Sequence, residues 1–223
     1  MLKNITPSSK IIGLLGMLAI IYTNLATSHI TLLTLATLLG GLLGFASVIL
    51  IVNRSWWAGL TGLLSAILYI YVAIVGQNPS DAILNVFFIL ALDIPIIFNK
   101  EWQSDTEPNA MSLKQGLVLL GVFLVMFLGM YYMESAILHT PRFLWSPLAS
   151  ALGITAAVST GFMRTKEGFY IWSAQNVLQV ILWSLTAFAG DASWGMAVVY
   201  GFYTVNALSS FTNGKWFTKE EVA

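Results

Sequence analysis

Residues 56–75, WWAGLTGLLSAILYIYVAIV, run for twenty positions without a charged side chain and end at the turn Gly76-Gln77-Asn78-Pro79-Ser80. An apolar run of this length matches the thickness of the bilayer hydrocarbon when it is helical, so it predicts a transmembrane helix. Ser80 and Asp81 are expected to cap the helix that follows. Similar apolar runs lie on both sides, separated by polar or turn residues. Together they predict eight helices, at 11–27, 30–52, 56–75, 80–98, 114–133, 144–163, 168–189 and 193–212.

The composition agrees with a protein embedded in lipid. Hydrophobic residues make up 57% of the 223 residues and charged residues 9%, whereas soluble domains carry about 25% charged residues. Cytosolic enzymes, nucleic-acid binders and secreted modules are therefore excluded, and a net charge of zero gives no reason to expect an anionic partner. The chain has no cysteine and two widely separated histidines, His29 and His139, so we expect no disulfide, metal or cofactor.

The positions of the lysines and arginines predict the orientation of the chain. Eight spans leave Arg142 alone on one side, and the positive-inside rule then puts both termini in the cytoplasm. The cations on the other side are Lys3, Lys10, Arg54, Lys100, Lys114, Arg164, Lys166, Lys215 and Lys219. If segment 11–27 lay on the membrane surface, the ratio would weaken from 9:1 to 7:3, so we expect this segment to span. The stretch that ends it and follows it, TNLATSHI at residues 23–30, lacks an A-x-A-like cleavage site, which argues against a signal peptide.

The chain also contains a hidden duplication. A shift of 114 positions aligns residues 56–102 with residues 170–216 without a gap. Matches of leucine and isoleucine carry little weight in apolar sequence, but a turn glycine and a closing Asn-x-x-Trp carry more. These matches are Gly76 with Gly190, Asn99 with Asn213 and Trp102 with Trp216. Chance similarity among apolar helices is the alternative.

The duplication predicts the architecture of an all-α integral membrane protein forming a single transport domain. Each aligned block, with the helix before it, makes a three-helix repeat, at 30–98 and 144–212. The linker helix 114–133 lies between the repeats and the N-terminal helix 11–27 precedes them. Because the linker is a single span, both repeats enter the membrane in the same direction. Parallel repeats in this 3+1+3 order are the arrangement of SWEET-like transporters.

One polar stripe stands out in the seventh segment, WSAQNVLQVILW. Trp172, Asn176, Gln179 and Trp183 recur at spacings of four, three and four, which places them on one helix face. Amides bind hydroxyls and carboxamides, and a tryptophan face stacks on a planar ring and attracts a cation. The face therefore predicts contacts to a small polar ligand. The alternative is structural, with amides joining helices and tryptophans at the membrane interface.

The repeat adds a cavity to this prediction. The positions equivalent to the four stripe residues are Ala58, Gly62, Ser65 and Tyr69, and three of them are small. Large recognition side chains that face small residues leave space between the two repeats near the middle of the membrane. Transporters built from repeats bind their substrates at such a place.

Two other segments contribute polar candidates. The last segment carries Tyr200, Tyr203 and Asn206, and the fourth carries Asn85 and Phe88. The fourth also carries Asp93, the one carboxylate that the sequence places well inside a span, with Pro95 after it. A lone acid in a membrane suggests a proton or cation site. We expect instead that Asp93 and Pro95 are a gate or structural pair, with Asp93 bonding backbone amides that the proline frees.

The tryptophan and asparagine pattern at Trp172, Asn176 and Trp183, the ILN-x-F-F at Ile83–Phe88, the tyrosine-rich last span and the 3+1+3 repeat resemble the Pnu family of bacterial vitamin transporters. The resemblance implies a homotrimer in the bacterial inner membrane that carries nicotinamide riboside by facilitated diffusion, without an ion gradient. A cytoplasmic kinase then traps the nucleoside. Relatives in this family take thiamine or riboflavin, which remain alternatives.

Carried over to this sequence, the resemblance makes ligand contacts of six positions. These are Trp172, Asn176, Gln179, Trp183, Asn85 and Tyr203. The sequence departs from the family at Asp93–Phe98, where DIPIIF replaces a Tyr-Gly or Gly-Trp step. The departure concerns the lower gate, and proton-coupled transport through Asp93 is kept as a further alternative.

Functions of other classes are weakly supported. A membrane enzyme would need a catalytic cluster at the lipid boundary, but Asp93 and Glu134 fall on opposite sides. A sensor would be expected to carry an output domain, and the loops are too short for one. Walker, Rossmann, HExxH and GxSxG motifs are absent from the sequence. We therefore predict a transporter and not an enzyme, with the lipid bilayer and a small molecule as its partners.

Overall fold

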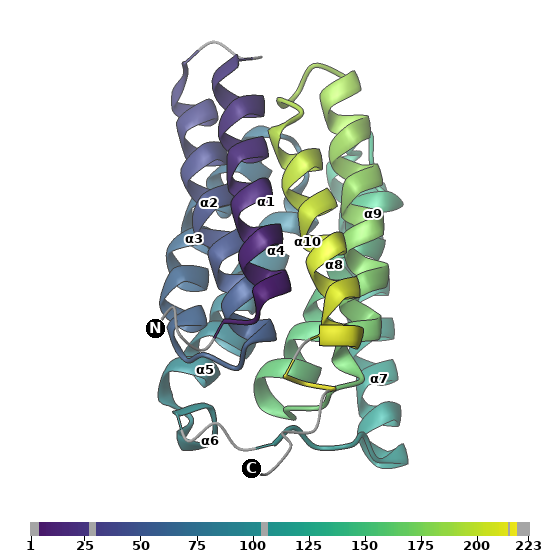
Figure 1. Cartoon of the computed structure of the whole chain (residues 1–223). Coiled ribbons are helices and arrows are strands. Elements are labelled where there is room, and N and C mark those ends of the chain that lie inside the picture. The colour runs from purple at the N-terminus through teal and green to yellow at the C-terminus, as the bar shows by residue number, and fades with distance from the viewer. Residues whose placement is uncertain (1–4, 27–29, 104–106, 214, 218–223) are drawn as a thin grey trace.

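A computed structural model shows a bundle of long helices, and the described residues form no β-strand (Figure 1). The described residues are 5–26, 30–103, 107–213 and 215–217. Lys3, His29 and Lys219, which entered the charge and metal arguments, lie outside them. α1 begins and α10 ends at the same end of the bundle (Figure 1). This arrangement suits the expected location of both termini on one side, although which side is cytoplasmic stays a prediction.

Each of the eight apolar segments contains one helix or one continuous run of helices. Three of the runs include a π-helical turn, labelled η2, η3 and η4. The helices are α1 (Pro7–Ala26), α2 (Leu32–Val52), α3 (Trp57–Val75), α4 (Pro79–Phe88) with η2 (Ile89–Asp93) and α5 (Ile94–Phe98), α6 (Lys100–Gln103), α7 (Leu113–Tyr132) with η3 (Met133–Leu138), α8 (Trp145–Ala157) with η4 (Val158–Phe162), α9 (Gly168–Phe188) and α10 (Gly195–Asn213).

Five of the described helices are long and apolar enough to cross a membrane. They are Pro7–Ala26, Leu32–Val52, Trp57–Val75, Pro79–Phe98 and Leu113–Leu138. α9 and α10 have sufficient length, with 21 and 19 residues, but they carry more polar side chains. Eight spans therefore remain a prediction for α8, α9 and α10.

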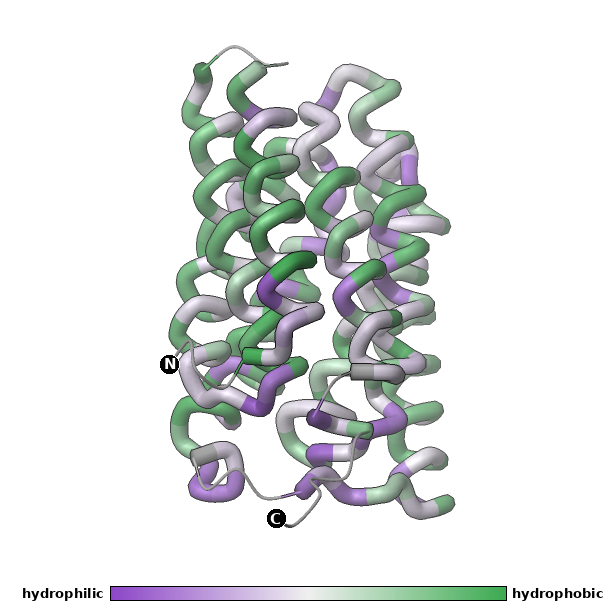
Figure 2. The backbone as a smooth tube through the Cα atoms, in the orientation of Figure 1, coloured by the Kyte–Doolittle hydropathy of each residue, from purple (hydrophilic) through white to green (hydrophobic). Residues whose placement is uncertain are grey.

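The helices differ in how much of their surface the protein covers. α2 packs against α1, α3 and α10, and 67% of its span is buried, whereas only 11% of the α7 span is buried. Leu117, Val125 and Leu128 of α7 are exposed, and Figure 2 shows hydrophobic residues on the outer turns of the bundle. Exposed apolar surface on this scale is typical of a protein whose solvent is lipid.

The fourth run of helix widens ahead of its proline. Pro95 has no backbone N–H to donate to the preceding turn, and residues Ile89–Asp93 before it form the π-helical turn η2. An α-helix advances about 100° per residue, so it would turn Asp93 about 140° away from Phe88. The i to i+5 pattern of a π-turn instead places Asp93 over Phe88. The turn therefore brings the carboxylate to the same face as the aromatic ring.

The connecting turns resemble one another in the two halves of the chain. Arg54 and Arg164 both adopt a positive φ, 54° and 49°, before α3 and α9. After these helices, Gln77 and Gly190 have φ of 54° and 83°. The shift of 114 positions pairs Gly190 with Gly76, whereas the positive φ angles pair Gly190 with Gln77. The ungapped alignment is therefore one position out of register at this turn. The 3+1+3 repeat itself stays a prediction.

Candidate functional site

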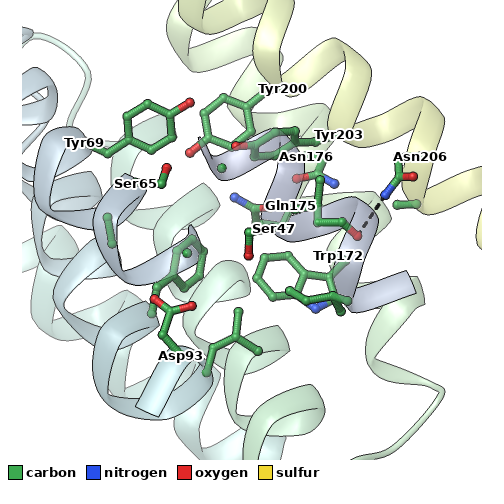
Figure 3. Close-up of a pocket in the computed structure, with 18 of the residues that line it drawn as sticks. Ser47, Ser65, Tyr69, Asp93, Trp172, Gln175, Asn176, Tyr200, Tyr203 and Asn206 are labelled. Carbon is green, nitrogen blue, oxygen red and sulfur yellow. Dashed lines mark hydrogen bonds between the residues drawn. The ribbon is translucent and has the colours of Figure 1, made fainter. Parts of the chain in front are cut away.

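A pocket lies inside the bundle, between α2, α3, the α4–η2 run, α9 and α10 (Figure 3). It encloses about 720 Å³ of space, including the part open to solvent. Side chains from all of these helical runs line the pocket, so a small molecule inside it could be contacted from several sides.

Most of the site residues predicted from the sequence line this pocket. The lining includes Trp172, Asn176, Tyr203, Asn206, Asn85, Phe88, Tyr69 and Asp93. Gly62 and Ser65, which the repeat identified as cavity walls, line it too, whereas Ala58 does not. Gln179, Trp183 and Pro95 also lie outside the lining. Four separate helical runs thus bring the predicted residues together.

An aromatic pair forms one wall of the pocket. The ring centroids of Phe88 and Trp172 are 5.4 Å apart with an angle of 51° between the planes. The indole N–H of Trp172 donates to Thr160 Oγ1 at 2.9 Å, which fixes the orientation of the ring. A tryptophan held in this way offers a preformed surface for a planar ligand ring.

Amide side chains line the pocket with unsatisfied oxygens. Asn85 donates its Nδ2 to the Asp81 carbonyl at 2.8 Å, and Asn206 donates its Nδ2 to the Val48 carbonyl at 3.2 Å. The Oδ1 atoms of Asn85, Asn176 and Asn206 are buried and have no hydrogen-bond partner among the described residues. Buried acceptors without partners are uncommon in proteins. They are suited to a ligand that donates hydrogen bonds.

Three tyrosines surround another part of the pocket, as Figure 3 shows. The rings of Tyr200 and Tyr203 are 5.2 Å apart and meet edge to face. The Tyr69 hydroxyl is buried and has no partner among the described residues. A Cβ atom at Gly44 would overlap the Tyr203 hydroxyl and lie 2.6 Å from Ser65 Oγ, so this position must be glycine for the wall to form. The tyrosines add hydroxyl groups to the amide oxygens.

Asp93 lines the pocket as well, and its gate or structural role stays a prediction. Only 1% of the residue is exposed, and its Oδ2 has no hydrogen-bond partner among the described residues. Oδ2 therefore remains available to a ligand. The π-turn η2 ends at Asp93, whose side chain faces the pocket.

The last two residues of the predicted stripe, Gln179 and Trp183, pack inside the protein and do not line the pocket. Gln179 is fully buried and donates its Nε2 to Asp81 Oδ1 at 2.6 Å. Trp183 is also fully buried and packs against Gly76, where an added Cβ would lie 3.1 Å from the indole. Trp172 and Trp183 are about 16 Å apart along the axis at 1.5 Å per residue. The helix face is continuous, but the pocket extends along only part of it.

Some features of the site were missed in the sequence. Ser47 and Gln175 also line the pocket, and both polar atoms of the Gln175 amide lack partners among the described residues. Asp81 was expected to be a helix cap, but Asn78 precedes α4 as its N-cap, and Asp81 is fully buried. Asp81 is therefore a second buried carboxylate, near the start of the helical run that carries Asp93. Nothing in the local pattern distinguishes a buried acid in the first turn of a helix from a capping residue.

The lining residues supply groups that can bind a small molecule. No group of three or more His, Cys, Asp or Glu side chains that could hold a metal occurs in the part of the chain that the structure describes. No Lys, Arg or His lines the pocket. The site thus offers a stacking surface, hydrogen-bond acceptors, hydroxyls and a single carboxylate. These groups can hold a small ring compound that donates hydrogen bonds.

A helical membrane protein with a ligand-sized opening between its helices fits the class of small-molecule transporters. The model of one family, described as nicotinamide mononucleotide transporter, matches residues 34–218. The chain belongs to this family, which confirms the resemblance to the Pnu transporters. A comparison with the curated proteins finds no match.

The fold is similar to that of a solved structure titled "Crystal structure of the Vitamin B3 transporter PnuC". The two chains are 16% identical and superimpose with a TM-score of 0.76, over 95% of this chain and 91% of that chain. At this identity the likeness establishes the fold and leaves the ligand open. The family and the fold together indicate a multi-pass membrane transporter.

Proposed function

We propose that the protein carries nicotinamide riboside across the bacterial inner membrane by facilitated diffusion, with alternating access and no ion coupling. It has no enzymatic activity in this proposal. The observation that carries the proposal is the pocket, where the ordered ring of Trp172 lies among amide oxygens without partners. The printed name of the similar structure, a vitamin B3 transporter, supports the same class of vitamin.

Each chemical group of this nucleoside can interact with a group in the pocket lining. Its planar nicotinamide ring can stack on Trp172 and Phe88. Its carboxamide N–H groups and ribose hydroxyls can donate to the free Oδ1 atoms of Asn85, Asn176 and Asn206. Each bond formed satisfies an acceptor that burial otherwise penalises by about 1 to 3 kcal/mol. Recognition by hydrogen bonds of this kind also rejects ligands that lack the donors.

The nucleoside fits better than the mononucleotide that the family description names. A phosphate monoester carries nearly two negative charges and is normally bound by Arg, Lys or a helix N-terminus. The pocket lining contains none of the basic residues and includes the carboxylate of Asp93. Without a basic side chain in the lining, the phosphate charge stays unpaired, which disfavours nicotinamide mononucleotide.

The remaining parts of the proposal follow the family resemblance. They are a homotrimeric assembly, both termini in the cytoplasm, and a cytoplasmic kinase that traps the product of transport and links it to NAD biosynthesis. Thiamine and riboflavin are alternative substrates, since each also has ring systems and hydrogen-bond donors. Proton-coupled transport is a second candidate, because Asp93 Oδ2 is buried without a partner among the described residues.

Calorimetric titration of the purified, full-length protein tests the proposed substrate. Nicotinamide riboside, nicotinamide mononucleotide, thiamine and riboflavin are compared under the same conditions. We expect nicotinamide riboside to bind at least about tenfold more tightly than the mononucleotide, a difference of about 1.4 kcal/mol. Tighter binding of thiamine or riboflavin would identify one of those vitamins as the substrate instead. Tighter binding of the mononucleotide would refute the argument from charge.

A further inference from the structure

We propose that Asp93 is a specificity-determining residue that selects ligands with a positively charged ring. This inference rests on the proposed function, since it concerns the same pocket. Asp93 is 1% exposed, lines the pocket and keeps one carboxylate oxygen without a hydrogen-bond partner among the described residues. Figure 3 shows its carboxylate at the end of the pocket opposite to Tyr69 and Tyr200. The carboxylate is therefore placed to face a ligand.

Two glycines of α3 make room for this carboxylate. A Cβ atom at Gly62 would overlap Asp93 Oδ1 and lie 2.9 Å from its Cγ and 3.0 Å from Ser47 Oγ. A Cβ atom at Gly59 would lie 2.7 Å from the backbone oxygen of Asp93. α3 can thus approach η2 closely only because both positions lack side chains. The close approach and the π-turn together hold the carboxylate at the pocket wall.

The pocket lining contains no side chain that can neutralise this carboxylate. Its lining has no Lys, Arg or His, and Ser47, the nearest hydroxyl to the Gly62 site, already donates to the Ala58 carbonyl at 2.8 Å. A carboxylate in a poorly hydrated site is costly unless a positive charge compensates it. A ligand that carries the charge on its own ring gains this interaction, and a neutral ligand of the same shape does not.

The aromatic wall strengthens the preference for a cation. Phe88 lies five residues before Asp93, on the face that the π-turn shares, and its ring contacts Trp172. The face of a tryptophan or phenylalanine ring attracts a cation. A ring cation stacked on these residues would interact with the π-face and with Asp93 at once. The ligand class is therefore an aromatic ring with a quaternary nitrogen, such as an N-ribosylpyridinium.

The test compares two ligands that differ only in the charge of the ring. Nicotinamide riboside carries a positive ring nitrogen, and benzamide riboside, in which carbon replaces that nitrogen, is neutral. We expect the wild-type protein to bind the cation at least about tenfold more tightly, because the charges attract at short range in a site of low dielectric. Wild-type protein that binds both ligands equally would overturn the inference without any variant.

Variants then assign the preference to Asp93. D93N should bind both ligands with affinities within about threefold of each other, and Asp93→Glu should restore the preference for the cation. D81N is the matched control, because Asp81 is a buried acid on the same helical run that lies outside the pocket lining. D81N should keep the wild-type preference. Melting temperature and elution volume of each variant report on folding.

The outcomes separate this inference from the proposed function. If wild-type protein binds nicotinamide riboside but D93N keeps the preference for the cation, or weakens both ligands alike, the role of Asp93 is refuted and the proposed function stands. If wild-type protein does not bind nicotinamide riboside, the proposed function fails and the inference fails with it.

Discussion

Replacing Gly62 with leucine should weaken ligand binding strongly while leaving a folded protein. Gly62 lines the pocket, and the first added atom would already overlap Asp93 Oδ1 and lie 3.0 Å from Ser47 Oγ. Leucine adds about four heavy atoms, which must enter the pocket or displace the Asp93 carboxylate. Overpacking of this kind costs about 1 to 3 kcal/mol. If this cost appears as a loss of binding free energy, the affinity falls roughly 5-fold to 140-fold, at 1.4 kcal/mol for each factor of ten.

A graded series and a matched control accompany this substitution. Gly62→Ala adds only the Cβ atom and should weaken binding less than Gly62→Leu. Ser65→Ala should bind within about threefold of wild type, because the Ser65 hydroxyl donates to the Gly40 carbonyl at 2.7 Å and contributes little to the pocket volume. Gly201→Leu is the control, since a Cβ atom at this position of α10 has no atom within 4 Å. It adds the same side chain at a site with free space.

The assay is calorimetric titration with nicotinamide riboside, after size-exclusion chromatography and a melting curve for each variant. We expect Gly62→Leu to elute as wild type, melt at a moderately lower temperature and bind the ligand at least about fivefold more weakly. Gly201→Leu should bind as wild type does. Normal affinity in a well-folded Gly62→Leu protein would place the ligand elsewhere and refute the role assigned to the pocket.

Three further predictions concern other parts of the molecule. Trp172→Ala should weaken ligand binding about tenfold or more, because it removes the stacking ring, whereas Trp183→Ala should lower the melting temperature and leave the affinity within about threefold; the reverse result in calorimetry would restore the whole stripe as a contact surface. Arg142→Gln should lower the melting temperature by several degrees, because Arg142 is buried and donates to Asn78 Oδ1, the Gly76 carbonyl and Asp191 Oδ2 at 2.9, 2.8 and 3.0 Å; an unchanged melting curve would show that these bonds contribute nothing net. Counterflow in proteoliposomes should proceed without a proton or sodium gradient, and accumulation driven by either gradient would contradict uncoupled transport.

The sequence predicts the helices because the membrane imposes a simple rule. A run of about twenty apolar residues must form a helix in lipid, since the backbone has no other hydrogen-bond partner there. For this reason the start and end of α2 and α3 lie within two residues of their predicted positions. The π-turns were not predicted, because widening a helix by one residue changes neither length nor hydropathy noticeably. That one missed feature decided the orientation of Asp93.

The site was predicted only in part, because residue spacing shows which side chains share a helix face but not how far the pocket extends along that face. Spacing shows that Trp172, Asn176, Gln179 and Trp183 share one side of α9, and the structure agrees on that geometry. Which of them meet a ligand depends on the helices opposite. Small residues on α3 leave space beside the first two, while Asp81 and the α3–α4 turn fill the space beside the others. Residues far away in the sequence determine which side chains of α9 meet a ligand, so the sequence of α9 alone cannot show it.

The closing Asn-x-x-Trp motif of the duplication acquires a physical meaning in the structure. Trp102 donates its indole N–H to the Gly161 carbonyl at 3.5 Å, and Trp216 donates to the Ile51 carbonyl at 2.7 Å. Each tryptophan at the end of one half therefore bonds the end of the first helix in the other half.

The two tryptophan rings also contact one another, with centroids 5.5 Å apart. Their cluster includes Ile51 and Leu92, which line the pocket, so it lies directly beyond the pocket wall. A ligand that leaves toward this end has to separate the pair. The opposite end, where Arg142 joins the Gly76 carbonyl to Asp191, is held by hydrogen bonds of a different kind. Different contacts hold the two ends, so under the alternating access that we propose one end would open while the contacts at the other stay formed.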